Sequence, residues 1–84
     1  MGASRGVIAV FGGGGFIGSH LCQRLIDQGK SVVAVDIDSE KIANLLSEES
    51  FTFHEADITD EENDELCRQV VNEADVVFDL IAYA

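Results

Sequence analysis

The sequence contains no proline and no tryptophan, and it has no long uninterrupted apolar run. Without proline there is no proline-rich linker, so the 84 residues are expected to form at most one small domain. A membrane-spanning helix would need about 18 uncharged apolar residues in succession, and the first ten residues lack the features of a signal peptide. We therefore expect a cytoplasmic protein.

Basic residues are also scarce. Five Lys and Arg stand against 16 Asp and Glu, which gives a net charge of -11. Partners such as nucleic acid or an anionic membrane require a basic surface, so we expect neither. A phosphate group held by backbone amides needs no Lys or Arg and is compatible with this composition.

Cysteine and histidine are too few and too scattered to indicate a metal or redox site. Cys22 and Cys67 are distant in sequence and form no C-x-x-C pair, so we interpret both as small apolar residues on helices. His20 and His54 have no cysteine or carboxylate at a metal-ligand spacing. Both histidines are expected to be structural.

Four short apolar runs, rich in β-branched and aromatic residues, predict strands, and the first two of these strands are expected to be buried. They lie at residues 7–11, 32–35, 51–53 and 76–82. Helical patterns separate these runs, and strands that alternate with helices form a parallel sheet with right-handed crossovers. The sequence thus predicts an α/β fold of order β-α-β-α-β-α-β with helices on both faces. The fourth strand would have an open edge, where we expect self-association or a homo-oligomer contact.

The first helix is indicated by a stripe at helical spacing. Ile17, Leu21 and Leu25 recur every four residues, and Gly29 is suited to end the helix. A short second helix can be capped by Asp38 or Ser39.

A third helix is predicted from a cap. Thr59, with Glu62 three residues later, has the spacing of a capping box.

The stretch VFGGGGFIGSHL, residues 10–21, places four consecutive glycines between the first strand and the first helix. Each glycine costs about 1 kcal/mol of folding entropy where regular structure would otherwise form, so bare backbone must be needed here. A glycine-rich turn between a strand and a helix directs backbone N–H groups and the positive helix end at a pyrophosphate. This context predicts the first half of a Rossmann-type dinucleotide-binding sheet.

The glycines allow two registers. Gly13, Gly15 and Gly18 fit G-x-G-x-x-G, whereas Gly12, Gly15 and Gly18 fit G-x-x-G-x-x-G. The alternation of the preceding strand favours Gly12 as the first functional glycine.

Asp36 ends the second predicted strand about 20 residues after the glycine turn, which is the spacing of a ribose-binding carboxylate. Such a carboxylate accepts from both ribose hydroxyls and repels a 2′-phosphate, so NAD is favoured over NADP. The simpler alternative is that Asp36 only caps a turn. A methyltransferase-type fold holding S-adenosylmethionine is a further alternative, although that ligand has no pyrophosphate for the glycine triplet to hold.

GGGGFIGSHL resembles the opening of the extended short-chain dehydrogenases/reductases, the NAD-dependent sugar-nucleotide epimerases, dehydratases and decarboxylases. EADITD (55–60) and DVVFDLIAYA (75–84) are similar to later segments of that family, so the resemblance covers the whole chain. It implies that Asp57 hydrogen-bonds the adenine amino group, that Ile58 contacts the ring, and that Leu80 and Ala82 line the pocket. The expected cofactor-binding residues are Gly12, Gly15, Phe16, Ile17, Gly18, Asp36, Asp57, Ile58, Leu80 and Ala82.

Within the family, the chain is most similar to the UDP-glucuronic acid decarboxylases. Ile81 matches a branched aliphatic residue found in that branch, whereas Asp79 and Phe11 depart from the histidine and threonine of many members. An NAD-dependent 4-epimerase or dehydratase and a non-catalytic dinucleotide-sensing module are the alternatives.

The family's chemistry implies a Tyr-x-x-x-Lys pair with a neighbouring Ser or Thr. The sequence has a single tyrosine, Tyr83, and both lysines, Lys30 and Lys41, lie far upstream. We therefore assign no catalytic residue. Residues 1–84 are expected to be the N-terminal part of a dinucleotide-binding domain, with a sugar nucleotide bound only in the complete enzyme.

Overall fold

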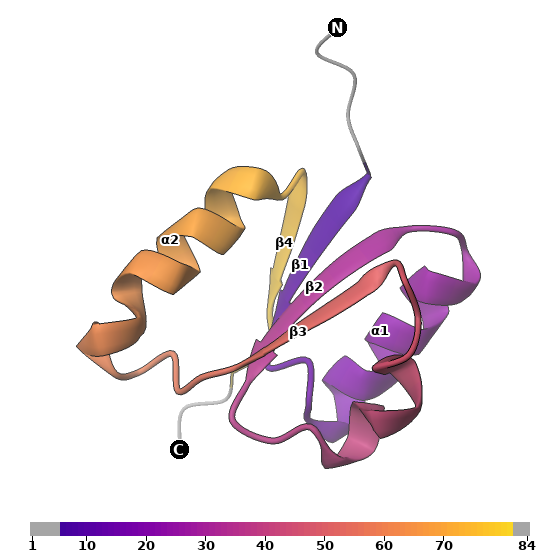
Figure 1. Cartoon of the computed structure of the whole chain (residues 1–84), viewed down its shortest axis with the longest axis horizontal. Coiled ribbons are helices and arrows are strands. Elements are labelled where there is room, and N and C mark those ends of the chain that lie inside the picture. The colour runs from indigo at the N-terminus through magenta and orange to yellow at the C-terminus, as the bar shows by residue number, and fades with distance from the viewer. Residues whose placement is uncertain (1–5, 82–84) are drawn as a thin grey trace, which may run out of the picture.

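The computed structural model describes residues 6–81, and its centre is a four-stranded sheet (Figure 1). All strand pairs are parallel, and the spatial order is β3-β2-β1-β4. The strands are β1 (Val7–Phe11), β2 (Ser31–Asp36), β3 (Phe51–Glu55) and β4 (Val76–Asp79). The predicted α/β fold is confirmed.

Helical segments connect the strands and lie on both faces of the sheet, with α1 on one side and α2 on the other (Figure 1). They are α1 (Phe16–Asp27), η1 (Glu40–Leu45), η2 (Glu61–Asn63) and α2 (Asp64–Glu73). The second predicted helix, η1, is a 3₁₀ helix and not an α-helix. Among the described residues, no helix is both long and apolar enough to cross a membrane.

The apolar sequence of β1 matches its burial on both faces of the sheet. Ile8 and Val10 pack into the core on the α1 side, while Ala9 and Phe11 join Val70 of α2 on the other side. Successive strand residues point to opposite faces, so a strand covered on both faces must be apolar throughout.

The fourth strand is shorter than predicted. It ends at Asp79, not at residue 82, because the Asp79 carboxylate accepts the N–H of Ile81 at 3.1 Å and turns the chain out of the ladder. Leu80 still donates to the carbonyl of Phe11 at 2.8 Å, which keeps it beside the end of β1. All four β4 residues are exposed, and β4 is the outermost strand on its side of the sheet.

The predicted end of the first helix is confirmed. Gly29 has φ +82°, a left-handed conformation suited to glycine, and its N–H donates to the carbonyl of Ile26 at 2.9 Å. The N–H of Lys30 donates in turn to the carbonyl of Leu25 at 3.0 Å. Together these bonds satisfy carbonyls that the helix end would leave free.

The predicted capping box is wrong. The Thr59 hydroxyl donates to Oδ1 of Asp57 at 2.6 Å, and the residue that caps η2 is Asp60, whose Oδ1 accepts the N–H of Glu62 at 3.0 Å. The N–H of Glu62, which a capping box would bond to the Thr59 hydroxyl, donates instead to the Asp60 carboxylate, because hydrogen bonds to charged groups are stronger.

At η1, one of the two predicted capping residues makes the side-chain hydrogen bond and the other occupies the N-cap position. Asp38 Oδ1 accepts the N–H of Glu40 at 2.9 Å, whereas Ser39 occupies the N-cap position without a side-chain bond.

Candidate functional site

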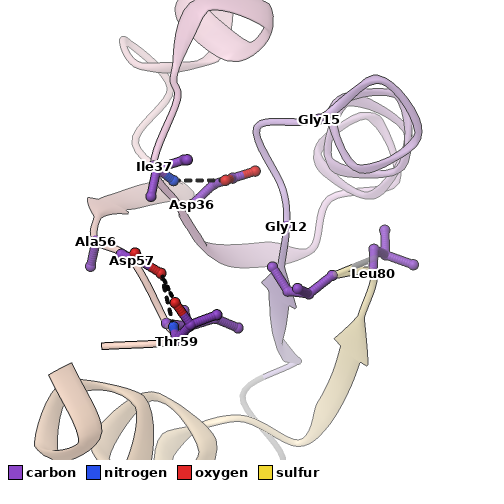
Figure 2. Close-up of a pocket in the computed structure, with 10 residues that line it drawn as sticks. Gly12, Gly15, Asp36, Ile37, Ala56, Asp57, Thr59 and Leu80 are labelled. Carbon is purple, nitrogen blue, oxygen red and sulfur yellow. Dashed lines mark hydrogen bonds between the residues drawn. The ribbon is translucent and has the colours of Figure 1, made fainter. Parts of the chain in front are cut away.

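The carboxyl ends of the parallel strands meet at a cavity of about 310 Å³ (Figure 2). Ligands of open α/β sheets bind at this edge of the strands. The cavity is lined by Gly12, Gly15, Asp36, Ile37, Ala56, Asp57, Ile58, Thr59, Leu80 and Ile81. An adjoining hollow of about 280 Å³ is lined by Gly12, Gly15, Phe16, Ile17, Gly18 and Leu80.

Every predicted binding residue in the described part of the chain lines one of these two hollows. Ala82 lies outside the described residues, as does Tyr83. Sequence reasoning missed Ile37, Ala56, Thr59 and Ile81 as lining residues. Each of the four lies next to or close to a predicted site residue in a loop that follows a strand, and that position was the available signal.

The glycine turn is fixed by two different requirements. Gly12 has φ +89°, and a Cβ there would lie 3.2 Å from the carbonyl carbon of Leu80. At Gly13, a Cβ would lie 2.7 Å from Cβ of Ala34 and 3.3 Å from Sγ of Cys22. Gly13 therefore lies beneath α1, against the core, whereas Gly12 borders the cavity. This placement favours the register that begins at Gly12.

Gly18 and Gly15 differ in what a side chain would meet. A Cβ at Gly18 would overlap the carbonyl oxygen of Gly12, so the first turn of α1 rests directly on the loop. A Cβ at Gly15 would meet only that same oxygen, at an ordinary 3.5 Å, and the φ of -77° suits any residue. The protein's own packing therefore does not require glycine at position 15, and the open space beside it fits a ligand.

The start of α1 carries no compensating charge. Its N-cap is Gly15, which makes no side-chain cap bond, and its first turn contains no acidic residue. The first amides of a helix have no partner within the helix and carry a partial positive charge. Although the chain is strongly acidic, this helix end offers a site for an anion.

Phe16 and Ile17 flank these amides and are 68% and 70% exposed. Ile17, which belongs to the stripe that predicted the helix, therefore lies outside the buried face of α1, where Cys22 and Leu25 pack. The first turn borders the hollow and not the core.

Asp36 directs its carboxylate at the glycine turn (Figure 2). Oδ2 accepts the N–H of Gly14 at 2.9 Å, and Oδ1 accepts the N–H of Ile37 at 2.7 Å. The second bond is the local contact of a turn cap, but the first joins segments far apart in the sequence. A carboxylate oxygen can accept more than one hydrogen bond, so both oxygens can also receive ribose hydroxyls.

Asp57 is an exposed acceptor at the far side of the cavity. Its Oδ1 accepts the hydroxyl of Thr59 at 2.6 Å and the N–H of Thr59 at 2.9 Å. These two bonds, the hydroxyl first, lower the pKa of Asp57 below its ordinary value. The residue is thus ionised at neutral pH and can accept a further bond from a ligand amino group.

The two cysteines are free thiols away from these hollows. Burial raises the pKa of Cys22 to about 11, and burial together with the charge of Asp64 raises the pKa of Cys67. Both thiols are protonated at neutral pH, which agrees with a packing role.

The chain is similar to UDP-D-apiose/UDP-D-xylose synthase 1 of Arabidopsis thaliana, at 34% identity over 89% of this chain and 20% of that protein. Among solved structures, it is similar to the PbgP3 protein of Burkholderia pseudomallei, with a TM-score of 0.85 and 30% identity over 98% of this chain and 24% of that one.

It is also similar to a UDP-glucose 4-epimerase of Thermotoga maritima solved with UDP-glucose, with a TM-score of 0.68 and 36% identity over 93% of this chain and 25% of that one. The chain spans about a fifth of the length of the curated relatives it matches. Residues 8–84 match the family model of NAD-dependent epimerases and dehydratases. The chain therefore belongs to the NAD-dependent epimerase/dehydratase family, whose cofactor is the one predicted from the glycine turn and Asp36.

Proposed function

We propose that the chain is the NAD-binding N-terminal portion of a sugar-nucleotide-modifying enzyme and is not catalytic alone. The observation that carries this proposal is Gly15. The protein's own packing does not require glycine at this position, because an added Cβ would meet only one oxygen at an ordinary distance. Gly15 is the N-cap of α1, whose first turn contains no acidic residue to balance the positive helix end. It also lies next to Gly14, whose N–H donates a hydrogen bond to the Asp36 carboxylate. A ligand that brings an anion against bare backbone explains all three features.

Each part of the dinucleotide has a matching group. The pyrophosphate accepts hydrogen bonds from the first backbone N–H groups of α1, and the helix dipole favours its negative charge without any cationic side chain. The ribose hydroxyls donate to Asp36. The adenine ring lies against Ile37 and Ile58, with its amino group donating to Asp57. Bound NAD supplies hydride transfer, and the residues of this chain hold and orient it.

Within the family, we propose a parent enzyme of the UDP-glucuronic acid decarboxylase type. The similarity to a synthase whose named products are nucleotides of five-carbon sugars supports this branch. The similarity to UDP-glucose 4-epimerase supports the alternative. A longer protein containing this chain should release carbon dioxide from UDP-glucuronic acid. Conversion of UDP-glucose to UDP-galactose without that release would favour the epimerase.

Calorimetric titration of the chain with NAD, NADP and S-adenosylmethionine, at one salt concentration, tests the binding site directly. We expect measurable binding of NAD and clearly weaker binding of NADP. Equal affinity for NAD and NADP would remove the ribose role of Asp36. Preference for S-adenosylmethionine would favour the methyltransferase-type alternative, and binding of no ligand would contradict the proposal.

A further inference from the structure

Gly14 is the point at which the glycine turn touches the segment after β2. Its N–H donates to Oδ2 of Asp36 at 2.9 Å. A Cβ on Gly14 would overlap the carbonyl oxygen of Asp38 and lie 3.0 Å from its carbonyl carbon. The obstacle is main chain and not a flexible side chain, so a substitution would have to displace the segment 36–38 itself.

That segment holds the other oxygen of Asp36. The N–H of Ile37 donates to Oδ1 at 2.7 Å, and the carboxylate of Asp38 fixes the following turn through the N–H of Glu40 at 2.9 Å. The Asp36 carboxylate is therefore held by two amides, one from each of two segments that meet at Gly14. A shift of either segment would release one of its oxygens.

We propose that Gly14 is a positioning residue for Asp36 and that it sets the preference for NAD over NADP; this inference rests on the proposed NAD site. Its N–H and its bare Cα together lock the glycine turn to the segment 36–38. A carboxylate held in this way cannot turn aside from a 2′-phosphate, so the repulsion is retained in full. Once freed, the same carboxylate can rotate away and admit NADP.

The contact itself can be tested without any ligand. In the Asp36→Ala variant, hydrogen exchange of the Gly14 amide, followed by NMR, should accelerate about tenfold or more, because a bond to a charged acceptor is lost. The Gly12 amide, which donates to the carbonyl of Val35 at 2.8 Å, is the internal control and should keep its rate. An unchanged Gly14 rate would overturn the proposal.

The effect on selectivity is tested by comparing Gly14→Ala with Gly13→Ala in titrations with NAD and NADP. In Gly14→Ala the ratio of the two affinities should fall by about tenfold, the scale of one lost charge-assisted hydrogen bond. The matched control, Gly13→Ala, strains the contacts with Ala34 and Cys22, so it should lower the melting temperature and keep the ratio.

Three outcomes separate this inference from the function on which it rests. If wild-type chain prefers NAD and Gly14→Ala keeps that preference, the positioning role is refuted and the proposed function stands. If both alanine variants lose selectivity equally, general loosening of the loop is the cause, and the positioning role is again refuted. If wild-type chain binds neither nucleotide, the proposed function fails, and the selectivity role fails with it.

Discussion

Replacing Gly15 by valine should strongly weaken NAD binding while leaving the chain folded. The backbone at position 15 is extended, with φ -77° and ψ 178°, which valine adopts readily. An added Cβ has only the carbonyl oxygen of Gly12 nearby, at 3.5 Å. The remaining branches would enter the space that Gly15 shares between the two hollows, where the pyrophosphate is proposed to lie.

The expected loss of folding stability is smaller than the expected loss of binding free energy for NAD. Valine is a poorer N-cap than glycine, which should destabilise the fold by about 1 kcal/mol and lower the melting temperature by about 4–8 °C. Displacing the pyrophosphate from two helix amides would remove two charge-assisted hydrogen bonds. That loss amounts to about 3 kcal/mol or more, so the Kd for NAD should rise at least about 100-fold.

Circular dichroism melting and calorimetric titration of the same preparation separate these effects. Gly18→Ala is the contrasting variant, because its Cβ would overlap the carbonyl oxygen of Gly12 and strain the packing of α1. We expect that strain to cost about 1–3 kcal/mol of folding stability. Should Gly15→Val stay folded and bind NAD with wild-type affinity, the assignment of the pyrophosphate to this helix end would be refuted.

Three other perturbations have defined outcomes. Asp36→Ser should lower the affinity for NAD more than the affinity for NADP in parallel titrations. An equal loss of both affinities would show that the carboxylate does not bind the ribose hydroxyls. Val77→Lys places a charge on the exposed β4 edge and should reduce the self-association seen by sedimentation velocity; a concentration-independent monomer in wild type would contradict the edge contact. Thr59→Val should raise the pKa of Asp57 toward its ordinary value, as measured by carboxyl-carbon NMR, and an unchanged pKa would show that the hydroxyl does not lower it. Since the pKa of Asp57 is lowered in the folded chain, its stabilising contribution is complete above the ordinary value and is lost as pH falls through the lower one.

The fold could be predicted because local patterns and global architecture agree along most of the chain. The apolar runs of β1 and β2, the glycine turn between them and the stop at Gly29 each specify their own conformation from nearby residues. The two errors of boundary have one cause. At Glu62 and at Ile81, the backbone N–H donates to a carboxylate two residues earlier, Asp60 and Asp79 respectively, and not to the partner that the pattern had assigned to it.

Site residues that belong to a recognisable sequence motif were predicted. Residues that line the cavity only because they lie beside such a motif were missed. Asp36 was recognisable from its spacing after the glycine turn, and Asp57 from the resemblance of EADITD to a family segment. Ile37 and Ala56 line the cavity through their place beside these residues, which no periodicity reveals. The role of Gly14 was likewise hidden, because it depends on how closely the segment 36–38 approaches the glycine turn in space.

The anion-binding end of α1 belongs to a chain with a net charge of -11, and this combination has a kinetic consequence. Hydrogen bonds from helix amides act over a few ångströms, whereas the repulsion between the acidic surface and an approaching dinucleotide extends over the Debye length, about 10 Å at 0.1 M salt. Added salt screens the repulsion and leaves the contacts largely intact. Association with NAD, measured by stopped flow, should therefore become faster as ionic strength rises, the reverse of the behaviour of a phosphate site built from lysine and arginine.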